Sequence, residues 1–322
     1  MLKFNKDQAD TWASMGPRAM FGQFMIDLAD KVEKLIVLSG DLGRSSGLDR
    51  FKKKFPDKYL SVGICEQNLI GVASGLSREG YKVFVTSFAP FLSMRASEQI
   101  RMNLGYMRHN VNIVALGSGV SMAYLGNSHY GLEDINYIRS IPGINISCPS
   151  DCAELGKVIY DYALNDRGPS YIRLTGVPGR KRVFKKNFNY KFGKAINLTK
   201  GSNILILSHG SIVSDCKEAV EDLKSENINC SLININSLNP LDKSIFKTIN
   251  QHKHIIVVEE HSSIGGLYSI ISEHLSASGN NKKIYGLNLG KTFGPTGTYQ
   301  YLLNYHGLSA KNIKKFIRNK II

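Results

Sequence analysis

Short apolar segments alternate with longer segments of helical periodicity through the first 175 or so residues. The apolar segments are rich in Val and Ile, and they predict strands at residues 35–41, 59–63, 82–88, 112–118, 144–150 and 170–175. Segments 66–80 and 152–166 have the apolar period of a helix and are long enough to connect parallel strands. Continuous apolar strands separated by helices predict a mostly parallel sheet covered on both faces, which is an α/β fold.

The alternation stops between about residues 176 and 202, where Pro, Gly and many Lys occur. It then resumes with predicted strands at 203–210, 230–235, 254–260 and 282–289, and with predicted helices at 214–226, 241–251 and 265–275. We therefore expect two domains, 1–178 and 203–322, joined by a linker over 179–202. The second domain has fewer strands and is expected to be the smaller one.

Length and composition agree with this organisation. A chain of 322 residues suggests roughly two domains, and 43% hydrophobic with 21% charged residues is typical of globular proteins. No apolar run approaches the roughly 18 residues that span a bilayer, and the opening MLKFNKDQAD lacks the apolar segment of a signal peptide. The five cysteines are scattered and form no CxxC pair. We expect a cytoplasmic protein with no membrane association, disulfide framework or zinc site.

The formal net charge of +15 raises the question of nucleic-acid binding. The densest basic runs lie at 50–55, 179–186 and 311–320, and none is interleaved with aromatics as in a known nucleic-acid module. Solvated faces and a Lys-rich linker are therefore favoured, and no nucleic acid is expected as a partner. An anionic small substrate or an acidic partner subunit would explain the charge equally well.

Two polar strings suggest chemistry and are discounted. GSGVSM at Gly117 begins like a dinucleotide-binding fingerprint but lacks its third glycine. The run Glu259, Glu260 and His261 follows a predicted strand of the second domain. We interpret this run as a polar strand end beside the domain interface.

Glu66 stands out because it lies where an apolar strand ends and an apolar helix begins. A buried carboxylate is costly unless it has a partner. One interpretation is that Glu66 caps the amides of its own helix. The other is that it meets a nitrogen atom of a ligand.

The region around Glu66 resembles a known family. The chain is similar, over essentially its whole length, to the C-terminal half of transketolase, comprising the pyrimidine-binding and C-terminal domains. The motifs that carry the resemblance are SGDLGRSS, GICEQN, GVASGLSREGYKVFVTSFAPF, RASEQIR, GNSH, EDINYIRSIPGINISCPSD and HGLSAKNIKKFI. A more distant resemblance extends to deoxyxylulose-phosphate synthase and to the beta subunits of 2-oxo acid dehydrogenases.

The resemblance implies thiamine diphosphate as the cofactor. Glu66 matches the family glutamate that hydrogen-bonds N1′ of the aminopyrimidine, and Phe88 and Phe91 match the aromatics that pack this ring. Without the family match, two Phe residues three apart are more often part of a core. His129 in GNSH matches a histidine near the donor hydroxyls, so it is a candidate catalytic and substrate-binding residue. A loop histidine bonded to backbone is its alternative.

Three further residues match the family's phosphate-binding groups, namely Arg18, Ser45 and Arg173. A planar guanidinium suits phosphate or carboxylate. The chain departs from the family at Gly117, where a phosphate-binding histidine is usual, and at Tyr124 and Leu125, where an acidic pair is usual. The substrate is therefore expected to be an atypical sugar, phosphorylated or nucleotide-linked, or a 2-oxo acid donor that loses CO₂.

No Gly-Asp-Gly string of the family's diphosphate-binding domain occurs in the chain. The resemblance therefore implies an N-terminal diphosphate-binding partner subunit that holds Mg²⁺ or Ca²⁺, in an α₂β₂ heterotetramer. The expected function is the C-terminal subunit of a split transketolase-like enzyme that transfers a two-carbon ketol unit between sugar-like substrates. The alternatives are a beta-type subunit of a 2-oxo acid dehydrogenase or decarboxylase, a deoxyxylulose-phosphate-synthase-like enzyme, and a non-catalytic binding or regulatory relative.

Overall fold

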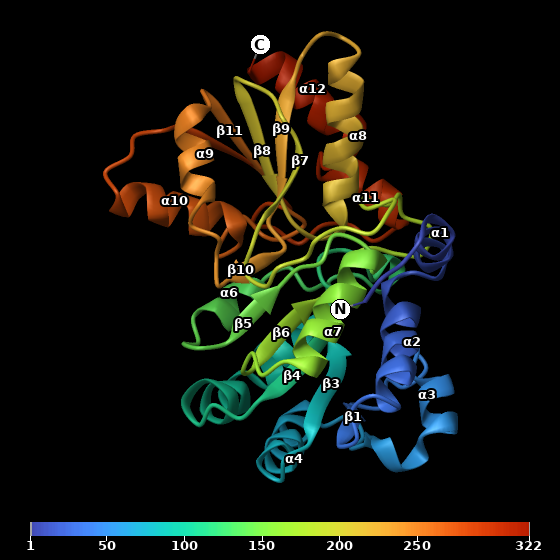
Figure 1. Ribbon diagram of the computed structural model, residues 1–322. Coiled ribbons are helices and arrows are strands. Elements are labelled where there is room, and N and C mark those ends of the chain that lie inside the picture. Colours follow the sequence, from blue (N-terminus) through green and yellow to red (C-terminus); the bar gives the residue numbers. More distant parts are fainter. Residues whose placement is uncertain (1, 322) are drawn as a thin grey trace.

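Two mostly parallel β-sheets, each flanked by helices, make up the computed structural model, which describes residues 2–321 (Figure 1). The first sheet lies in the lower half of Figure 1 and the second in the upper half. The predicted two-domain α/β fold is confirmed.

The first sheet has the strand order β10-β5-β6-β4-β3-β1-β2, and every neighbouring pair except β10 with β5 is parallel. Its strands β1 and β4 are completely buried, which explains their continuous apolar sequences. The strands are β1 (Leu35–Ser39), β2 (Tyr59–Ser61), β3 (Lys82–Phe88), β4 (Val111–Leu116), β5 (Asn145–Ser147), β6 (Ser170–Arg173) and β10 (Ser237–Asn239).

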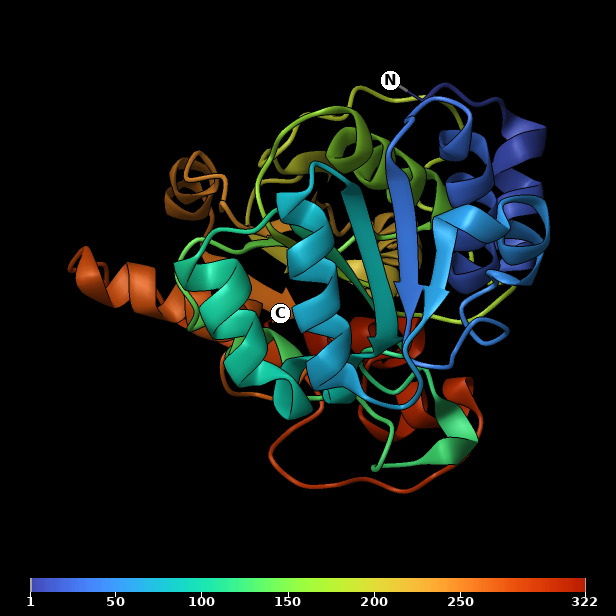
Figure 2. The ribbon, with the colours of Figure 1, turned by 90° about the horizontal axis from the view of Figure 1, so that it is seen from below.

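Different helices cover the two faces of this sheet. Residues of α4 pack on one face together with two π-helical segments, and residues of α2 and α7 pack on the other (Figure 2). The helices of this half are α1 (Lys6–Met15), α2 (Pro17–Ala29), α3 (Asp49–Lys54), α4 (Glu66–Arg78), α5 (Ser97–Gln99), α6 (Asp134–Arg139) and α7 (Cys152–Leu164), with the π-helical segments Phe91–Arg95 and Ile100–Tyr106. Short 3₁₀ turns lie at Pro56–Lys58 and Ala123–Leu125.

The second sheet has the order β12-β11-β8-β9-β7. Its strands are β7 (Ile196–Thr199), β8 (Ile204–Ser208), β9 (Cys230–Asn234), β11 (His254–Val258) and β12 (Ile284–Leu287). One face packs on α9 and α10, and the other packs on α8, α11 and α12. These helices are α8 (Val213–Lys224), α9 (Ile245–Gln251), α10 (Leu267–Ala277), α11 (Tyr299–Tyr305) and α12 (Ala310–Lys320), and a 3₁₀ turn lies at Gly210–Ile212.

Two short edge strands pair in ways that the sequence did not indicate, and one of them, β10, connects the two halves. β7 falls within the segment predicted as a linker, yet it pairs antiparallel with β9. β10 follows β9 in the chain, yet it pairs antiparallel with β5 of the first sheet. Both strands have only three or four residues, too few to show a recognisable period. The domain limits 1–178 and 203–322 therefore remain a prediction.

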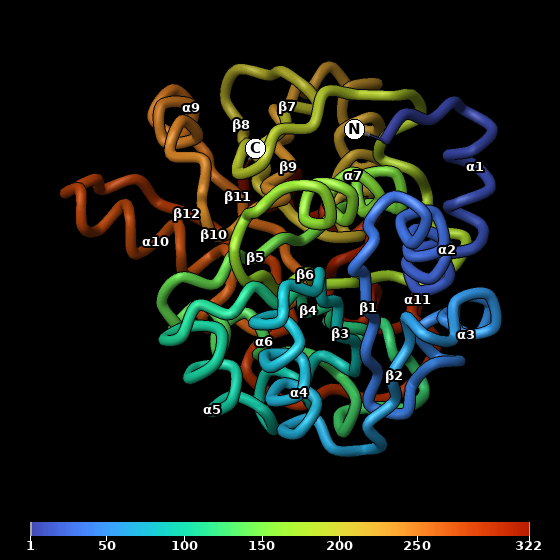
Figure 3. Tube along the Cα trace, turned by 60° about the horizontal axis from the view of Figure 1, so that its bottom comes forward, coloured from blue at the N-terminus to red at the C-terminus, as the bar shows by residue number. Residues whose placement is uncertain are grey.

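The segment before β7 lies on the surface of the first half. It appears in Figure 3 as a yellow-green tube that runs past α1. The Gly179 N–H donates to the Ala13 carbonyl at 2.9 Å, and Arg182 forms an ion pair with Asp10 at 2.7 Å. Within residues 2–321, no helix combines the length and the apolar character needed to cross a bilayer.

Candidate functional site

The candidate residues gather at one edge of the first sheet. Because β1, β2, β3 and β4 are parallel, their carboxyl ends meet at this edge, where α/β folds commonly bind ligands. Glu66 begins α4 shortly after β2, and Phe88 is the last residue of β3. The loop that carries His129 follows β4.

Glu66 is a buried carboxylate with side-chain partners. It is 1% exposed, its Oε1 accepts the Ser87 hydroxyl at 2.9 Å, and its Oε2 accepts Nη1 of Arg95 at 2.7 Å. The interpretation that Glu66 caps its own helix is wrong, because both oxygens are bonded by side chains from another segment. The two partners of this ion pair differ in exposure, because Glu66 is buried whereas the Arg95 side chain is 46% exposed.

Three rings form a cluster that Arg95 connects to this carboxylate. The ring centroid of Phe88 is 5.8 Å from that of Phe91, and the His129 centroid is 5.4 Å from each of them. The Arg95 guanidinium lies 4.3 Å from the Phe91 centroid and so connects the rings to Glu66. The structure therefore brings Glu66, Phe88, Phe91 and His129 together, although their roles toward a ligand remain predictions.

Ser87 and Arg95 were not selected from the sequence. Both lie within motifs that carry the family resemblance, and Ser87 directly precedes Phe88. Arg95 ends the π-helical segment that begins at Phe91, so the two side chains share a face. A charged residue four positions after a candidate aromatic on a helix is the signal that could have identified Arg95.

Arg18 and Ser45 lie on adjacent segments. A Cβ added at Gly47 would be 2.6 Å from the Arg18 carbonyl oxygen, so the loop that contains Ser45 packs against the start of α2. A Cβ added at Gly40, at the other end of this loop, would be 3.6 Å from Oε1 of Glu66. One loop therefore extends from Glu66 to Arg18. Burial lowers the pKa of the half-buried Arg18 guanidinium.

Arg173 is held by protein groups, and its role toward a substrate remains a prediction. Its side chain is 0% exposed, and its Nε donates to both oxygens of Asp134 at 3.0 and 2.9 Å. Its Nη2 donates to the carbonyls of Gly131 and Glu260 at 3.0 and 2.9 Å. Arg173 lies at the end of a buried strand between the two domains, and Asp134 compensates its charge inside the protein.

The family departures lie beside the aromatic rings or on the surface. A Cβ at Gly117 would be 2.5 Å from Cγ and Sδ of Met122 and 3.4 Å from Phe88. The Met122 thioether thus fills the space that a side chain at position 117 would need. Tyr124 and Leu125 follow in the same loop and are 71% and 51% exposed.

Replacing Gly117 with histidine should destabilise the protein by about 1–3 kcal/mol. Gly117 has a φ of +69°, which disfavours any side chain, and the new side chain would collide with Met122. Adding Met122→Ala should recover the steric part, so the double mutant should be more stable than the sum of the single effects predicts. A urea-denaturation double-mutant cycle measures this, and strictly additive effects would contradict the contact.

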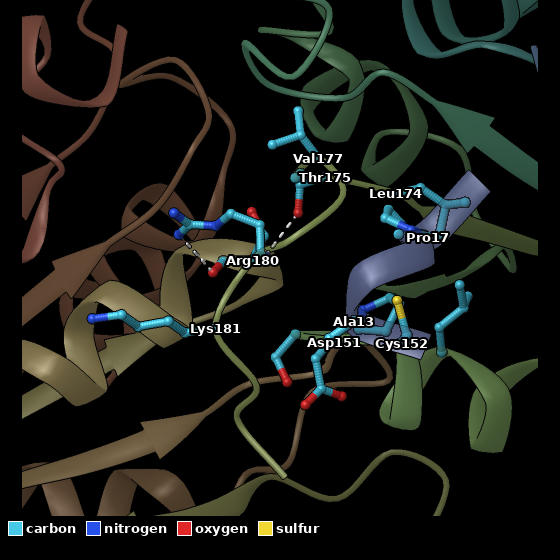
Figure 4. Close-up of a pocket in the computed structure, with 15 residues that line it drawn as sticks. Ala13, Pro17, Asp151, Cys152, Leu174, Thr175, Val177, Arg180 and Lys181 are labelled. Carbon is cyan, nitrogen blue, oxygen red and sulfur yellow. Dashed lines mark hydrogen bonds between the residues drawn. The ribbon is translucent and has the colours of Figure 1, made fainter. Parts of the chain in front are cut away.

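A separate cavity lies between the domains (Figure 4). Residues from α1, the start of α7 and the end of β6 line it, including Ala13, Cys152 and Leu174. Asp151 also lines it, but its carboxylate already accepts the N–H groups of Glu154, Val183 and Phe184. None of the predicted site residues borders this cavity, so it is not the candidate site. Among residues 2–321, no cluster of three or more His, Cys, Asp or Glu side chains is placed to hold a metal ion.

Comparison with known proteins gives two family matches. Residues 13–176 match the transketolase pyrimidine-binding domain, and residues 193–313 match the transketolase C-terminal domain. A putative transketolase C-terminal section from Methanocaldococcus jannaschii is 34% identical, covering 95% of this chain and 96% of the relative. A 6-deoxy-6-sulfo-D-fructose transketolase subunit from a Clostridium species is 31% identical, covering 92% of this chain and 91% of that subunit.

A third relative is longer than this chain. The 1-deoxy-D-xylulose-5-phosphate synthase of Dictyoglomus thermophilum is 33% identical over 92% of this chain, which spans 48% of that enzyme. Among solved structures, a split-gene transketolase described as an inactive beta4 tetramer is 31% identical, with a TM-score of 0.82, and covers 94% of this chain and 96% of its own. Since both domain models and relatives of nearly the same length match, the chain belongs to the transketolase family, where it corresponds to the pyrimidine-binding and C-terminal domains.

Proposed function

We propose that this chain is the C-terminal subunit of a split, thiamine-diphosphate-dependent transketolase-like enzyme in the cytoplasm. The enzyme would transfer a two-carbon ketol unit between sugar-like substrates. The observation that carries the proposal is the buried Glu66 carboxylate at the carboxyl edge of the sheet, connected through Arg95 to the rings of Phe88, Phe91 and His129. A split-gene transketolase of nearly the same length and fold supports the assignment to a subunit.

The residues at this edge fit an aminopyrimidine. Thiamine diphosphate, when bound, supplies a nucleophilic carbon for cleaving the bond next to a ketone. Glu66 would hold a proton at a carboxyl oxygen against the pyrimidine nitrogen, and its burial keeps water from competing for that hydrogen bond. Phe88 and Phe91 provide apolar ring faces that pack the heterocycle and exclude water.

The remaining residues would handle the substrate. His129 is half-buried at the end of a loop, and the Ser128 hydroxyl lies 2.9 Å from its Nδ1, which orients the ring. His129 would move a proton at a donor hydroxyl. Arg18 and Ser45 would bind the anionic end of the sugar, since their adjacent segments offer a guanidinium and a hydroxyl.

The diphosphate and its metal would be held elsewhere. The chain has no Gly-Asp-Gly string, and one relative of nearly the same length carries the name transketolase C-terminal section. An N-terminal partner subunit would hold the diphosphate and Mg²⁺ or Ca²⁺, giving an α₂β₂ heterotetramer. The Clostridium relative, named for a sulfonated sugar, supports an atypical sugar as the substrate here, and we propose a phosphorylated or nucleotide-linked one.

The purified chain is therefore expected to show no thiamine-diphosphate-dependent turnover by itself. Adding the N-terminal subunit should produce ketol transfer, because only then are both ends of the cofactor held. The measurement is product formation from ketose donors and aldose acceptors, with and without the partner. Strong activity of the isolated chain would overturn the split-enzyme proposal.

A second candidate function uses a 2-oxo acid donor. The 33% identity to a 1-deoxy-D-xylulose-5-phosphate synthase favours it as the alternative. Measuring CO₂ release from pyruvate in the same reconstituted complex separates the two candidates. CO₂ release without transfer from ketoses would favour this second candidate.

A further inference from the structure

The loop that carries His129 is closed at its base. It spans residues 117–131, and Gly119 and Gly131 exchange backbone hydrogen bonds of 2.8 and 3.1 Å across it. This leaves a segment of about ten residues, and His129 lies beside its base, just before Tyr130 and Gly131, with its ring against Phe88 and Phe91. The position of His129 therefore depends on how the base of the loop is held.

A carboxylate from the second domain binds this base. Glu260, two residues after β11, is 1% exposed, and its Oε1 accepts the backbone N–H of Val120 at 2.9 Å. A Cβ added at Gly119 would collide with the same carboxylate. Glu260 is thus packed directly on the loop backbone, with no room for a side chain at position 119.

The second carboxylate oxygen of Glu260 is bonded within the second domain. Oε2 of Glu260 accepts the Tyr299 hydroxyl at 2.6 Å and the Ser211 hydroxyl at 3.3 Å. Tyr299 begins α11, and Ser211 lies in the turn before α8. Because three donors surround the group, Glu260 has one defined position relative to the second sheet.

The backbone of Glu260 holds the other side of the loop base through Arg173. One nitrogen of Arg173, Nη2, donates to the Glu260 carbonyl at 2.9 Å and to the Gly131 carbonyl at 3.0 Å. Asp134 orients the guanidinium through its Nε. Residue 260 is therefore connected to both strands of the loop base, to Val120 directly and to Gly131 through Arg173.

The second domain also contacts the outer part of the loop. Asn127 donates to the Gly294 carbonyl at 2.9 Å. Figure 2 shows the orange-red segment before α11 as an arc beside the green loop. The second domain therefore contacts the loop both at its base and in its outer part. The contact at the base is made by the buried side chain of Glu260.

We propose that Glu260 is a positioning residue that fastens the 117–131 loop to the second domain and thereby holds His129 at the aromatic rings, a role that rests on the proposed function of His129. Glu260 does not touch the rings, so it acts through the loop. In this protein the C-terminal domain would contribute to turnover by fixing the geometry of the pyrimidine-binding domain.

The test compares Glu260→Ala with Glu260→Gln, using Glu221→Ala on the exposed side of α8 as the control. Amide hydrogen exchange over residues 117–131 of the whole chain should be about tenfold faster or more in Glu260→Ala. Glu260→Gln keeps a carbonyl for the Val120 N–H, so its exchange should stay near that of wild type. In the reconstituted complex, kcat of Glu260→Ala should fall by about tenfold to a hundredfold with unchanged cofactor affinity.

Wild-type exchange or wild-type kcat in Glu260→Ala would overturn the proposal, as would equal losses in the Ala and Gln variants. If Glu260→Ala does not fold, Gly119→Ala disturbs the same contact from the loop side, because its Cβ would collide with the Glu260 carboxylate. Unchanged loop exchange in that variant would also overturn the proposal. Absence of turnover in the wild-type complex would count against the proposed function instead. The exchange comparison would then still decide whether Glu260 fastens the loop.

Discussion

Replacing Glu66 with glutamine is expected to lower turnover of the reconstituted complex by about 10²- to 10⁴-fold, the usual contribution of a positioned acid or base. Glutamine keeps the shape of the side chain and can still bond Ser87, but it cannot give up a proton as a carboxylic acid can. The loss should therefore appear in kcat rather than in the fold. Steady-state kinetics with saturating thiamine diphosphate, together with the thermal unfolding temperature, measures both.

Two variants serve as controls for this experiment. Glu79→Gln changes an exposed residue that follows the same helix and should leave turnover unchanged. Ser87→Ala removes one hydrogen bond from Oε1 but keeps the acid, so it should reduce activity far less than Glu66→Gln. Wild-type turnover in Glu66→Gln would mean that this carboxylate is structural, and it would favour the non-catalytic alternative.

Replacing Asp134 with asparagine is expected to destabilise the protein by about 3–5 kcal/mol, the cost of leaving a buried charge without its partner. Arg173 is completely buried, and Asp134 is its one ion-pair partner within residues 2–321. Tyr171 also donates its hydroxyl to Asp134 at 3.0 Å. Asparagine preserves the volume but not the charge, so the guanidinium would remain uncompensated. Urea denaturation measures the change.

The effect should depend on pH in one direction. Burial by itself raises the pKa of Asp134. The charges of Arg173 and His261 lower this pKa, as do the hydrogen bonds that Arg173 and Tyr171 donate, and the overall result is a pKa below the ordinary value. A carboxyl whose folded-state pKa is lowered stabilises the protein at neutral pH, and this stabilisation is lost as the pH falls through that pKa. The difference between wild type and Asp134→Asn should therefore shrink in acid.

Asp222→Asn is the matched control for this ion pair. Asp222 is 52% exposed and lies 3.9 Å from Lys314, so its removal should change stability by about 0–1 kcal/mol. Equal effects of Asp134→Asn and Asp222→Asn would contradict the importance of burial.

The regular elements could be predicted because their signals are local. The apolar runs at 82–88 and 204–208 are fully or almost fully buried strands, and such strands have continuous Val, Ile and Leu. Neither the positions nor the pairing partners of β7 and β10 could be predicted from the sequence. Each is a short edge strand whose partner lies more than thirty residues away or in the other domain, and such pairing leaves no local period.

The burial and bonding partners of the polar run Glu259, Glu260 and His261 could not be predicted from the sequence either. The sequence predicted a polar strand end beside the domain interface, and these residues do directly follow β11. All three side chains prove to be at most 1% exposed. Burial pairs them with residues far away in the sequence, such as Val120 for Glu260 and His209 for Glu259. Composition alone does not distinguish such a network from a solvated strand end.

By itself, the sequence determined the two α/β domains and the family, and it predicted Glu66 with Phe88 and Phe91 as the centre of the site, because each depends on residues close together in the chain. The tertiary structure decided that Arg173 is an internal ion-pair partner, that Arg95 lies between Glu66 and Phe91, and that Glu260 accepts a hydrogen bond from the base of the His129 loop. The physical reason is distance along the chain. A charge becomes internal or external only when segments as far apart as Asp134, Arg173 and Glu260 pack together and exclude water.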